Sequence, residues 1–504
     1  LKVSSHQHPN ARMFWFLAAA YCIPVQSTLV WTDAQTIGVA GRAEFDTPRA
    51  SYYDRLPAEA ESEVRAPVWQ LSQMTSGMYL QFKTCSQVLS LSVVYTTMFM
   101  HAWNFAASGA AGLDLYAWDT SSNAWRWVDT TRNMTYPHAH NVLQAMPGPD
   151  TYYYRLHLPL YNGVKDFWIG HDSGCPLISH SDNFPRIVWY GTSITQGAVA
   201  SRPGMAFTNQ LQMRIPYDVL NFGYSSNCLM ELEVVKYLVQ IPNPALFVID
   251  CNANMEAEKI RSNTVPLVTF IREHHPDVPI ILAEETKIGS AWVEDWPRSV
   301  HEWRTEALSN SYQELVDAGM GRLHYVNRDQ LYNFQTLTDK DMSPTLDGIH
   351  PTDLGMQSIT NFYMQYLPPL LSNSPSMPSG MITNVAGVLP FYPGFTEAVE
   401  ESKAPLGDWH WTSVIDLGVM GRGFSDTPTP FSRLPNRAEG TVPDYTWAAS
   451  LHSTGLFVAF ETDAQAISLN FTLTSDSSGL WGMPMSGVSG MDLYRFDFEN
   501  GVWG

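Results

Sequence analysis

The chain has 504 residues, of which 45% are hydrophobic and 15% are charged. This balance excludes an intrinsically disordered protein, and the length predicts two to four domains. The formal net charge of −20 disfavours binding to nucleic acids or to anionic membrane surfaces. We therefore expect no nucleic-acid partner, and a protein that acts on neutral or cationic material.

An apolar run near the amino end, residues 13–25, has the length of a secretory signal and is too short to span a bilayer comfortably. We interpret residues 1–27 as a signal peptide, and expect a secreted protein or one in the lumen of the secretory pathway. The alternative is a buried strand or helix of the first domain. No other stretch has the length of a transmembrane helix, so we expect no membrane insertion apart from this leader.

Five cysteines occur, and none of them forms a CxxC motif, so neither a zinc ribbon nor a thioredoxin-like site is indicated. Cys22 falls in the leader, which leaves four: Cys85, Cys175, Cys228 and Cys251. The sequence does not pair them. Free buried thiols are the slightly favoured interpretation.

Residues 28–172 contain short runs in which apolar and polar residues alternate, such as Met78–Phe82, Leu89–Val93 and Leu113–Trp118. Alternation with a period of two, punctuated by Gly, Pro and Asn, is typical of half-buried antiparallel strands. We predict an antiparallel β-sandwich or jelly roll here. No catalytic constellation is apparent in this region.

From Pro185 onward, apolar runs alternate with amphipathic stretches, and residues 184–371 are predicted to be one α/β domain. The expected strands are Ile187–Tyr190, Val219–Phe222, Leu246–Asp250, Ile280–Ala283 and Leu323–Val326. The expected helices are a stretch ending near Arg214, then Leu229–Gln240, Glu256–His275, Arg298–Ala318 and Leu354–Leu367. Five such units give a parallel sheet between two layers of helices. Active sites of such sheets lie at the carboxyl ends of the strands, where the strand order reverses.

Residues 372–408, rich in Ser and Pro, are predicted to be a linker. Residues 409–504 then repeat the first region: Trp411 stands 380 residues after Trp31, and Trp447 stands 378 residues after Trp69. We expect this second copy to fold on the same antiparallel plan. Because it stops at Gly504, opposite Arg126, it should expose an unpaired edge and part of an apolar face. Cleavage in the linker should leave a fully active fragment.

The heptapeptide Gly191–Gly197 carries the chain's one G-x-S-x-x-x-G pattern, directly after an expected strand. A strand, a tight turn and a helix would lift the hydroxyl of Ser193 above the sheet as a nucleophile. An ordinary serine in a βα loop is the competing interpretation. Of the fifteen histidines, only His350 has an aspartate, Asp347, three residues before it. One loop could thus supply the base and the group that orients it.

Two further loops could stabilise an oxyanion. Gly223 follows the second strand and could present a backbone N–H, and Asn254 follows the third and could donate from its side chain. Both residue types are common in ordinary turns, so only their position at the ends of neighbouring strands favours a functional role.

These motifs resemble those of the SGNH (GDSL-type) hydrolases, and the resemblance covers nearly all of the chain past the leader. It is closest to the branch with GTSIT in place of GDS and an N-terminal β-domain with a G-x-D-L-Y motif. The matching segments are Gly191–Thr195, Asn221–Ser225, Asp250–Met255, Gly112–Tyr116 and Gly490–Tyr494. The resemblance implies a three-layer, flavodoxin-like hydrolase domain flanked by β-sandwiches.

The resemblance also implies Ser193 as nucleophile, His350 and Asp347 as its triad partners, and an oxyanion hole formed by the Ser193 and Gly223 amides and the Asn254 side chain. Thr192 replaces the usual Asp of the first block, which is not a triad member. The third block lacks its usual Gly, so either Asn252 or Asn254 could be the donor, and we prefer Asn254. Asn227 is a lesser candidate.

The sequence thus predicts a secreted serine esterase that removes acetyl or other short acyl groups, from a small ester or an acylated polysaccharide, without a metal or cofactor. Two alternatives stay open. The first is a lipid esterase such as a lysophospholipase, although no long apolar lid segment is visible near the site. The second is a catalytically silent carbohydrate-binding or adhesive protein, although Ser, His and Asp are all present.

Overall fold

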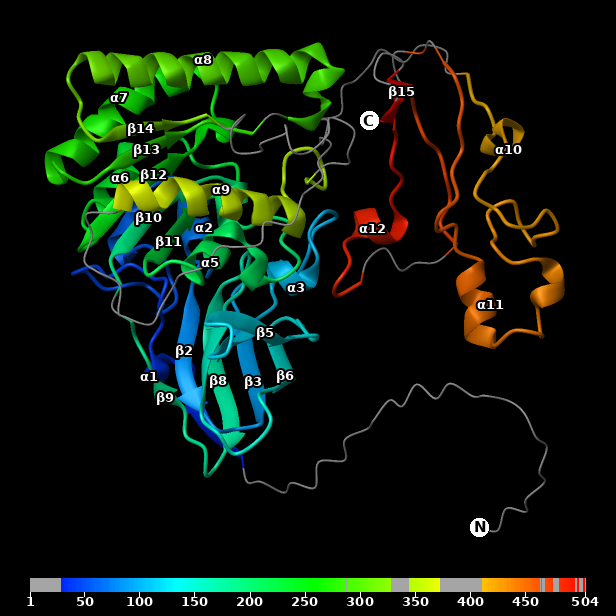
Figure 1. Cartoon of the computed structure of the whole chain (residues 1–504), viewed down its shortest axis with the longest axis horizontal. Coiled ribbons are helices and arrows are strands. Elements are labelled where there is room, and N and C mark those ends of the chain that lie inside the picture. Colours follow the sequence, from blue (N-terminus) through cyan, green and yellow to red (C-terminus); the bar gives the residue numbers. More distant parts are fainter. Residues whose placement is uncertain are drawn as a thin grey trace. The chain divides into compact units, whose positions relative to one another are not determined.

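The computed structural model describes residues 29–182, 184–286, 288–327, 344–371, 410–462, 464, 467–474 and 480–494, with the backbone of 496–497 and 502–503 (Figure 1). The predicted leader and linker lie outside these residues. By internal contacts the chain divides into two units, residues 1–398 together with 477–504, and residues 399–476. Each unit is described by itself.

A five-stranded parallel sheet forms the α/β domain, as the sequence predicts. Its strands are β10 (Arg186–Gly191), β11 (Asp218–Gly223), β12 (Pro244–Asp250), β13 (Ile280–Ala283) and β14 (Leu323–Val326). Their spatial order is β11-β10-β12-β13-β14, with every neighbouring pair parallel. The first strand therefore lies between the second and the third, and the order reverses at the carboxyl end of β10. Ligand sites of open α/β sheets lie at this point.

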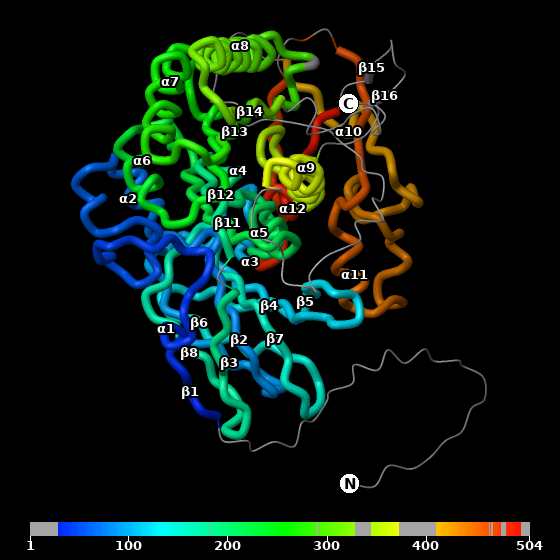
Figure 2. The backbone as a smooth tube through the Cα atoms, turned by 60° about the vertical axis from the view of Figure 1, so that its left-hand side comes forward, coloured from blue at the N-terminus to red at the C-terminus, as the bar shows by residue number. Residues whose placement is uncertain are grey.

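Helices cover both faces of the sheet, as Figures 1 and 2 show. They are α5 (Phe207–Gln212), α6 (Leu232–Leu238), α7 (Ala257–His274), α8 (Asp295–Asp317) and α9 (Asp353–Leu371). Each face of the sheet packs against its own hydrophobic core, and the side chains of β10 point alternately into one core and the other. Val188 and Tyr190 belong to the cluster that holds α6, α7 and α8, whereas Ile187 and Trp189 belong to the cluster that holds α5 and α9. A strand buried on both faces reads as an unbroken apolar run, which is why the sequence located it.

The amino-terminal region forms an antiparallel sandwich, which confirms the fold class expected for it. One sheet has the order β1-β8-β3-β6 and the other β5-β4-β7-β2-β9. The strands are β1 (Leu29–Asp33), β2 (Tyr79–Thr84), β3 (Val88–Tyr95), β4 (Asp114–Asp119), β5 (Ala124–Thr130), β6 (His138–Gln144), β7 (Tyr152–His157), β8 (Val164–Asp172) and β9 (Ile178–Ser179). Alternate residues of β3 and β2, including Leu89, Leu91, Leu80 and Phe82, fill the core between the sheets.

A segment before β2 packs on the hydrolase domain rather than into the sandwich. It contains the 3-10 helix η1 (Ala58–Ser62) and α2 (Ala66–Ser72), and Val68 and Trp69 share a core cluster with β11. The guanidinium of Arg55 is buried and donates to the carbonyls of Asn221 and Gly223, at 2.9 Å each. The end of β11 is therefore held by a residue from the predicted sandwich region.

The G-x-D-L-Y motif also joins the two domains. The carboxylate of Asp114 on β4 accepts from the Arg202 guanidinium at 2.6 Å and from the Gly204 amide at 3.0 Å. The Tyr116 ring lies so close to Gly204 that an added Cβ would be 2.3 Å from it. The motif thus seats the sandwich on the segment that follows the serine-bearing turn.

The four cysteines beyond the leader form two disulfides, Cys85–Cys175 and Cys228–Cys251. The preference for free buried thiols was wrong. The Cα atoms lie 5.0 and 4.9 Å apart, within the range that a disulfide requires. Sequence separations of 90 and 23 residues gave no sign of this proximity.

The second copy reproduces the short helices of the first but only part of its strand pairing. Helices α10 (Val414–Leu417) and α11 (Asp444–Ser450) correspond to α1 (Ala34–Ile37) and α2. The pair β15 (Phe496–Asp497) and β16 (Val502–Trp503) repeats the register of the β4–β5 hairpin. In the described part of 457–474, however, no strand forms, so the expectation of the same antiparallel plan is only partly met.

The two copies also differ in the exposure of their apolar side chains. In the first copy β3 pairs with β6 and β8. Leu89, Leu91 and Val93 are completely buried in the first copy. Their counterparts are 42–55% exposed: Ile467, Leu469 and Phe471. An apolar face is therefore exposed in the copy, as the sequence predicted.

Candidate active site

The serine-bearing turn begins where β10 ends. Thr192 caps the short helix α4 (Ser193–Gln196), because its hydroxyl accepts from the Ile194 amide at 3.3 Å. Gly197 ends the helix in the left-handed conformation, with φ of 101°. A side chain at Gly191 would lie 2.0 Å from the Thr195 hydroxyl, so only glycine fits there. The two glycines and the cap fix the turn that places Ser193 at the edge of the sheet.

The structure brings Ser193, His350 and Asp347 together. The Ser193 hydroxyl lies 2.9 Å from Nε2 of His350, and Nδ1 of His350 lies 2.7 Å from Oδ2 of Asp347. The loop that carries His350 and Asp347 precedes α9, 157 residues beyond the serine. The side chain of His350 is 23% exposed and that of Asp347 is 3% exposed. A hydroxyl, an imidazole and a buried carboxylate in this order form the geometry of a nucleophile, its base and the group that orients the base.

The Asp347 carboxylate is surrounded by donors. Burial would raise its pKa, but hydrogen bonds from His350, together with one from the Asn104 side chain, outweigh burial and lower the pKa below its usual value. The amides of Ile349 and His350 donate to Oδ1 at 3.1 and 2.8 Å. Asn104 Nδ2 donates to Oδ2 at 2.7 Å. These contacts hold an ionised carboxylate against the imidazole.

The Gly223 amide is engaged in this structure. It donates to the side-chain oxygen of Asn221 at 2.9 Å, and an added Cβ would lie 2.2 Å from the Gln196 nitrogen. To bind an oxyanion, this N–H would first have to leave Asn221. Ser226, in the same loop, adopts φ of 57°, a strained conformation for a residue other than glycine that is typical of functional loops. No hydrogen bond from the Ser226 amide is found within the described residues.

The asparagines near the site differ in accessibility. Asn252 is fully buried, whereas Asn254, at the end of the 3-10 helix η3 (Asn252–Asn254), is partly exposed. Among the described residues, neither polar atom of Asn252 has a hydrogen-bond partner, nor has the side-chain oxygen of Asn254. The Asn227 side chain donates to Ser225 and accepts from Arg65. This arrangement favours Asn254 over Asn252 and Asn227 as a side chain that a substrate can reach.

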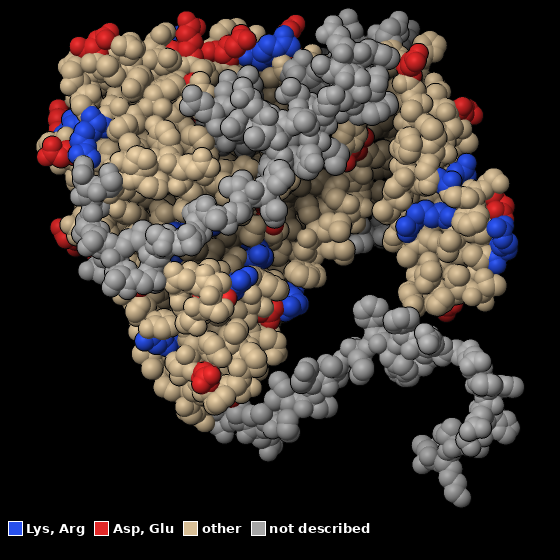
Figure 3. All heavy atoms as spheres, in the orientation of Figure 1, with Lys and Arg blue, Asp and Glu red and all other residues tan. Residues whose placement is uncertain are grey.

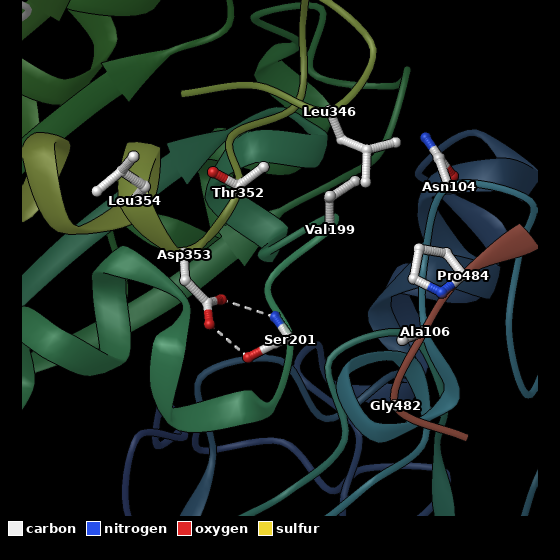
Figure 4. A pocket seen from close by; sticks show the side chains of 10 residues that line it. All are labelled: Asn104, Ala106, Val199, Ser201, Leu346, Thr352, Asp353, Leu354, Gly482 and Pro484. Carbon is white, nitrogen blue, oxygen red and sulfur yellow. Dashed lines mark hydrogen bonds between the residues drawn. The ribbon is translucent and has the colours of Figure 1, made fainter. Parts of the chain in front are cut away.

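A cavity of about 330 Å³ is lined by Asn104, whose side chain bonds Asp347, and by Leu346, the residue before Asp347 in the chain (Figure 4). On one side, Ser201 donates two hydrogen bonds to the Asp353 carboxylate, from its backbone N–H at 2.8 Å and from its hydroxyl at 2.5 Å. On the other side lies the segment of the second copy that contains Gly482 and Pro484. The complete lining is Asn104, Ala106, Val199, Ser201, Leu346, Thr352, Asp353, Leu354, Gly482 and Pro484. Gly482 and Pro484 belong to the first unit of the chain, as do the other residues that line the cavity.

Sequence reasoning did not find two features of the site. Asn104 comes from the sandwich region and lies 243 residues from Asp347 in the chain. The Cys228–Cys251 disulfide joins the loop after β11 to the loop after β12, the two loops in which oxyanion donors were expected. Neither feature has a local sequence signature.

A parallel sheet of this order, with a serine, a histidine and an aspartate gathered at the carboxyl ends of its strands, defines the class of serine hydrolases with a doubly wound fold. In the part of the chain that the structure describes, no group of three or more His, Cys, Asp or Glu residues could hold a metal ion. No helix in that part is long and apolar enough to cross a membrane.

Comparison with known proteins agrees with this class. The model of the GDSL-like lipase/acylhydrolase family matches residues 185–368, and the model of the GxDLY N-terminus of SGNH-hydrolase-type esterases matches residues 29–176 and 409–503. The chain belongs to the GDSL-like (SGNH) hydrolases with a GxDLY N-terminal domain, and it is a carboxylic ester hydrolase.

Among solved structures, a protein described as a GDSL-like lipase from Bacteroides ovatus is 27% identical, with a TM-score of 0.62, over 68% of this chain and 98% of its own. The salicylyl-acyltransferase SsfX3 of a tetracycline biosynthetic pathway is 16% identical, with a TM-score of 0.52, over 69% and 96%; it shows the fold alone. A family two carbohydrate esterase from Cellvibrio japonicus, 10% identical over 68% and 98% with a TM-score of 0.45, is too distant to indicate a substrate. A search of curated proteins found no match.

Proposed function

We propose that this protein is a serine esterase that removes acetyl or other short acyl groups from an acylated carbohydrate, with Ser193 as nucleophile. The observation that carries the proposal is the continuous hydrogen-bond chain from the Ser193 hydroxyl through His350 to Asp347. The family supplies the reaction class, ester hydrolysis. The short acyl group and the sugar follow from the motif resemblance.

In the first half of the reaction, Ser193 Oγ attacks the ester carbonyl carbon while Nε2 of His350 accepts the hydroxyl proton. The imidazolium keeps its Nδ1 proton in the bond to Asp347, which stabilises the new charge. The carbonyl oxygen becomes an oxyanion, for which the Ser193 amide, the Asn254 side chain and a backbone N–H of the Gly223–Ser226 loop are the proposed donors. The C–O bond to the alcohol then breaks, and the alcohol takes the proton from His350.

In the second half, water attacks the acyl-enzyme while His350 accepts its proton. Collapse of the second tetrahedral intermediate releases the acid and returns the proton to Ser193. Every proton transfer uses the one imidazole, so the proposed mechanism requires no cofactor.

We also propose that the protein works outside the cytosol. The two disulfides fit an oxidising compartment, in which such bonds persist. The net charge of −20 disfavours anionic surfaces, and in Figure 3 acidic side chains gather along the upper edge, where α8 lies. These features support a neutral, acylated polysaccharide over a phospholipid surface as the natural substrate.

Hydrolysis of p-nitrophenyl acetate and p-nitrophenyl palmitate by the full chain tests the proposal, with Ser193→Ala as the matched control. We expect rapid turnover of the acetate, little turnover of the palmitate, and loss of nearly all turnover in the variant. Preference for the palmitate would favour the lipid-esterase alternative. No turnover of either ester, or of an acetylated polysaccharide, would favour a silent binding protein.

A further inference from the structure

Among the described residues, the amino-terminal sandwich region contacts the proposed triad at two points: Tyr161 donates to the Ser193 carbonyl at 3.3 Å, and Asn104 donates to the Asp347 carboxylate. Asn104 lies in the loop before α3 (Ala107–Ala110) and donates from Nδ2 to Oδ2 of Asp347 at 2.7 Å. This is the same carboxylate oxygen that faces Nδ1 of His350. A donor at that oxygen fixes the rotation of the carboxylate and favours its ionised form. Ser108, four residues further along, also bonds the hydrolase domain, from its hydroxyl to the Ser201 carbonyl at 2.7 Å, but this hydrogen bond does not involve the triad.

The second copy has glycine at the matching position. At the offset of 378 residues, Trp103, Asn104 and Ser108 correspond to Trp481, Gly482 and Ser486. Both loops close with the same isolated bridge, Ala102 to Phe105 in the first and Leu480 to Met483 in the second. The loop geometry therefore does not require asparagine. Asparagine is present at this position only in the first copy, whose loop contacts the hydrolase loop that carries Asp347.

We propose that Asn104 is a positioning residue of the esterase, so that the β-domain contributes directly to the orientation of Asp347. This inference rests on the proposed function of Ser193, His350 and Asp347. Without Asn104, Oδ2 loses one of the donors that lower the pKa of Asp347, and the carboxylate is free to turn away from the imidazole. Asn104 acts through Asp347 and is not proposed to touch the substrate.

The test compares Asn104→Ala, Asn104→Asp and Ser108→Ala in the full chain. We expect Asn104→Ala to lower kcat roughly ten- to hundredfold with little change in KM, as for loss of a hydrogen bond to a charged group. The acidic limb of the kcat/KM profile should move to higher pH, and should move further in Asn104→Asp, which places a second carboxylate beside Asp347. Ser108→Ala should keep the kcat and the pH profile of the unmodified chain.

The outcomes separate this inference from the proposed function. An unchanged kcat and pH profile in Asn104→Ala, with Ser193→Ala inactive, would refute the positioning role and leave the esterase mechanism intact. Equal losses in Asn104→Ala and Ser108→Ala would show that Asn104 only joins the domains. Full activity in Ser193→Ala would refute the mechanism itself.

A different observation carries a second inference, about the loop pair itself. The Ser108 amide donates to the Trp481 carbonyl at 3.0 Å, and the Ser486 amide donates to the Trp103 carbonyl at 3.0 Å. Since Ser108 corresponds to Ser486 and Trp103 to Trp481, the two contacts are the same contact made in both directions. Trp103 and Trp481 are also equally exposed, at 47% and 49%. Reciprocal contacts between equivalent residues are the mark of a two-fold interface between identical surfaces.

We infer that the loop 102–108 of a GxDLY domain is a self-recognition surface whose partner is a second copy of the same loop. In this chain the partner is the loop 480–486, within the same unit. The bonds are made by backbone atoms, so the surface depends on loop shape rather than on one side chain. The pairing places Gly482 and Pro484 in the wall of the cavity that also contains Asn104.

To test this, a protease site is inserted within residues 372–408 of the full chain, and the cleaved protein is passed through a sizing column. We expect the two pieces to stay together. Ser486→Pro removes one of the two donors at a position in the first turn of α12 (Met485–Ser489), where a helix tolerates proline. It should weaken the association about two- to tenfold. Gly482→Ala is the matched control, because an added Cβ there meets nothing within 4 Å.

Hydrogen exchange at Ser108 and Ser486 in the uncut chain gives a second measurement that does not depend on the folding of a variant. Both amides should exchange slowly, and Ser486→Pro should accelerate exchange at Ser108. Separation of the pieces at once after cleavage, or fast exchange at both amides in the uncut chain, would overturn the inference.

Discussion

At the scale of single residues, the two asparagines after β12 differ in burial, and burial determines which of them a substrate can reach. Asn252 is completely buried and its two polar atoms have no partner among the described residues, so no substrate can reach it in this conformation. Asn254 lies two residues further on and is partly exposed. An oxyanion donor must meet a substrate atom at hydrogen-bond distance, so exposure decides between them.

We therefore expect Asn254→Ala to lower kcat by roughly a hundredfold or more, with little change in KM, because one oxyanion donor contributes about 3–4 kcal/mol to the transition state. Asn252→Ala should keep kcat, and its free energy of unfolding should fall little, because the side chain makes no hydrogen bond that the variant would lose. Steady-state kinetics and urea unfolding of both variants check this. An inactive Asn252→Ala beside a fully active Asn254→Ala would show that the preference is reversed.

The sequence located Ser193, His350 and Asp347 because each belongs to a short pattern beside a strand or helix end. It could not locate Asn104, whose role depends on a contact across 243 residues and between two domains. For Gly223 the sequence predicted a free amide, whereas Asn221 accepts from that amide. The side chain two positions earlier engages the Gly223 amide, and no sequence pattern predicts that hydrogen bond.

At the scale of elements, the strands of the parallel sheet were the most predictable feature, because burial on both faces leaves an unbroken apolar run. The expected ranges for β13 and β14 agree with the structure residue for residue, while β10, β11 and β12 are longer at their amino ends or at both ends. The sequence could not assign the segment before β2 to the hydrolase core. Its apolar residues indicate burial, but they do not indicate which domain they pack against.

The Cys228–Cys251 disulfide predicts an effect on catalysis that the other disulfide should not have. Replacing either pair by alanines should lower the free energy of unfolding by about 3–5 kcal/mol, from the loop lengths that the disulfides close. Only Cys228→Ala with Cys251→Ala should also lower kcat, because that disulfide joins the loops that hold Gly223 and Asn254. Thermal unfolding and kinetics at a temperature where every variant is folded separate the two effects. Equal kcat values in both double variants would contradict the prediction.

The G-x-D-L-Y aspartate predicts a pH dependence of stability. Burial raises the pKa of Asp114 from 3.8 to about 6, although Arg202, the Gly204 amide and Trp127 act in the opposite direction. Because the folded-state pKa lies above the unfolded value, the folded chain binds the proton more tightly between these two values. The contribution of Asp114 to stability is therefore complete below about pH 4 and is lost as the pH rises through 6.

Asp114→Asn cannot titrate and should lack this dependence. The free energy of unfolding of the unmodified chain, relative to that of the variant, should fall by about 3 kcal/mol between pH 3 and pH 7. Urea unfolding at several pH values measures the difference. A constant difference across this range, or one that rises with pH, would show that the ion pair with Arg202 outweighs burial.

At the scale of the whole molecule, the question is what the second copy contributes to the active site. All the proposed catalytic residues, together with Asn104, lie before residue 371. Among the described residues, the copy adds Gly482 and Pro484 to the wall of the cavity that Asn104 and Leu346 also line. Its apolar side chains Ile467, Leu469 and Phe471 are 42–55% exposed.

We therefore expect removal of everything after the linker to leave the chemistry intact. After cleavage within residues 372–408 and separation of the pieces in mild denaturant followed by its removal, the amino-terminal piece should hydrolyse p-nitrophenyl acetate with a kcat within about twofold of the intact chain. The reason is that Ser193, His350 and Asp347 do not line the cavity to which the second copy contributes, and their hydrogen bonds come from residues that the piece retains. For a bulky acylated oligosaccharide that extends into the cavity, KM should change while kcat does not, because Gly482 and Pro484 line the cavity but make no contact with the proposed triad. A large loss of kcat on the acetate, restored by adding back the carboxyl-terminal piece, would show instead that the second copy completes the active site.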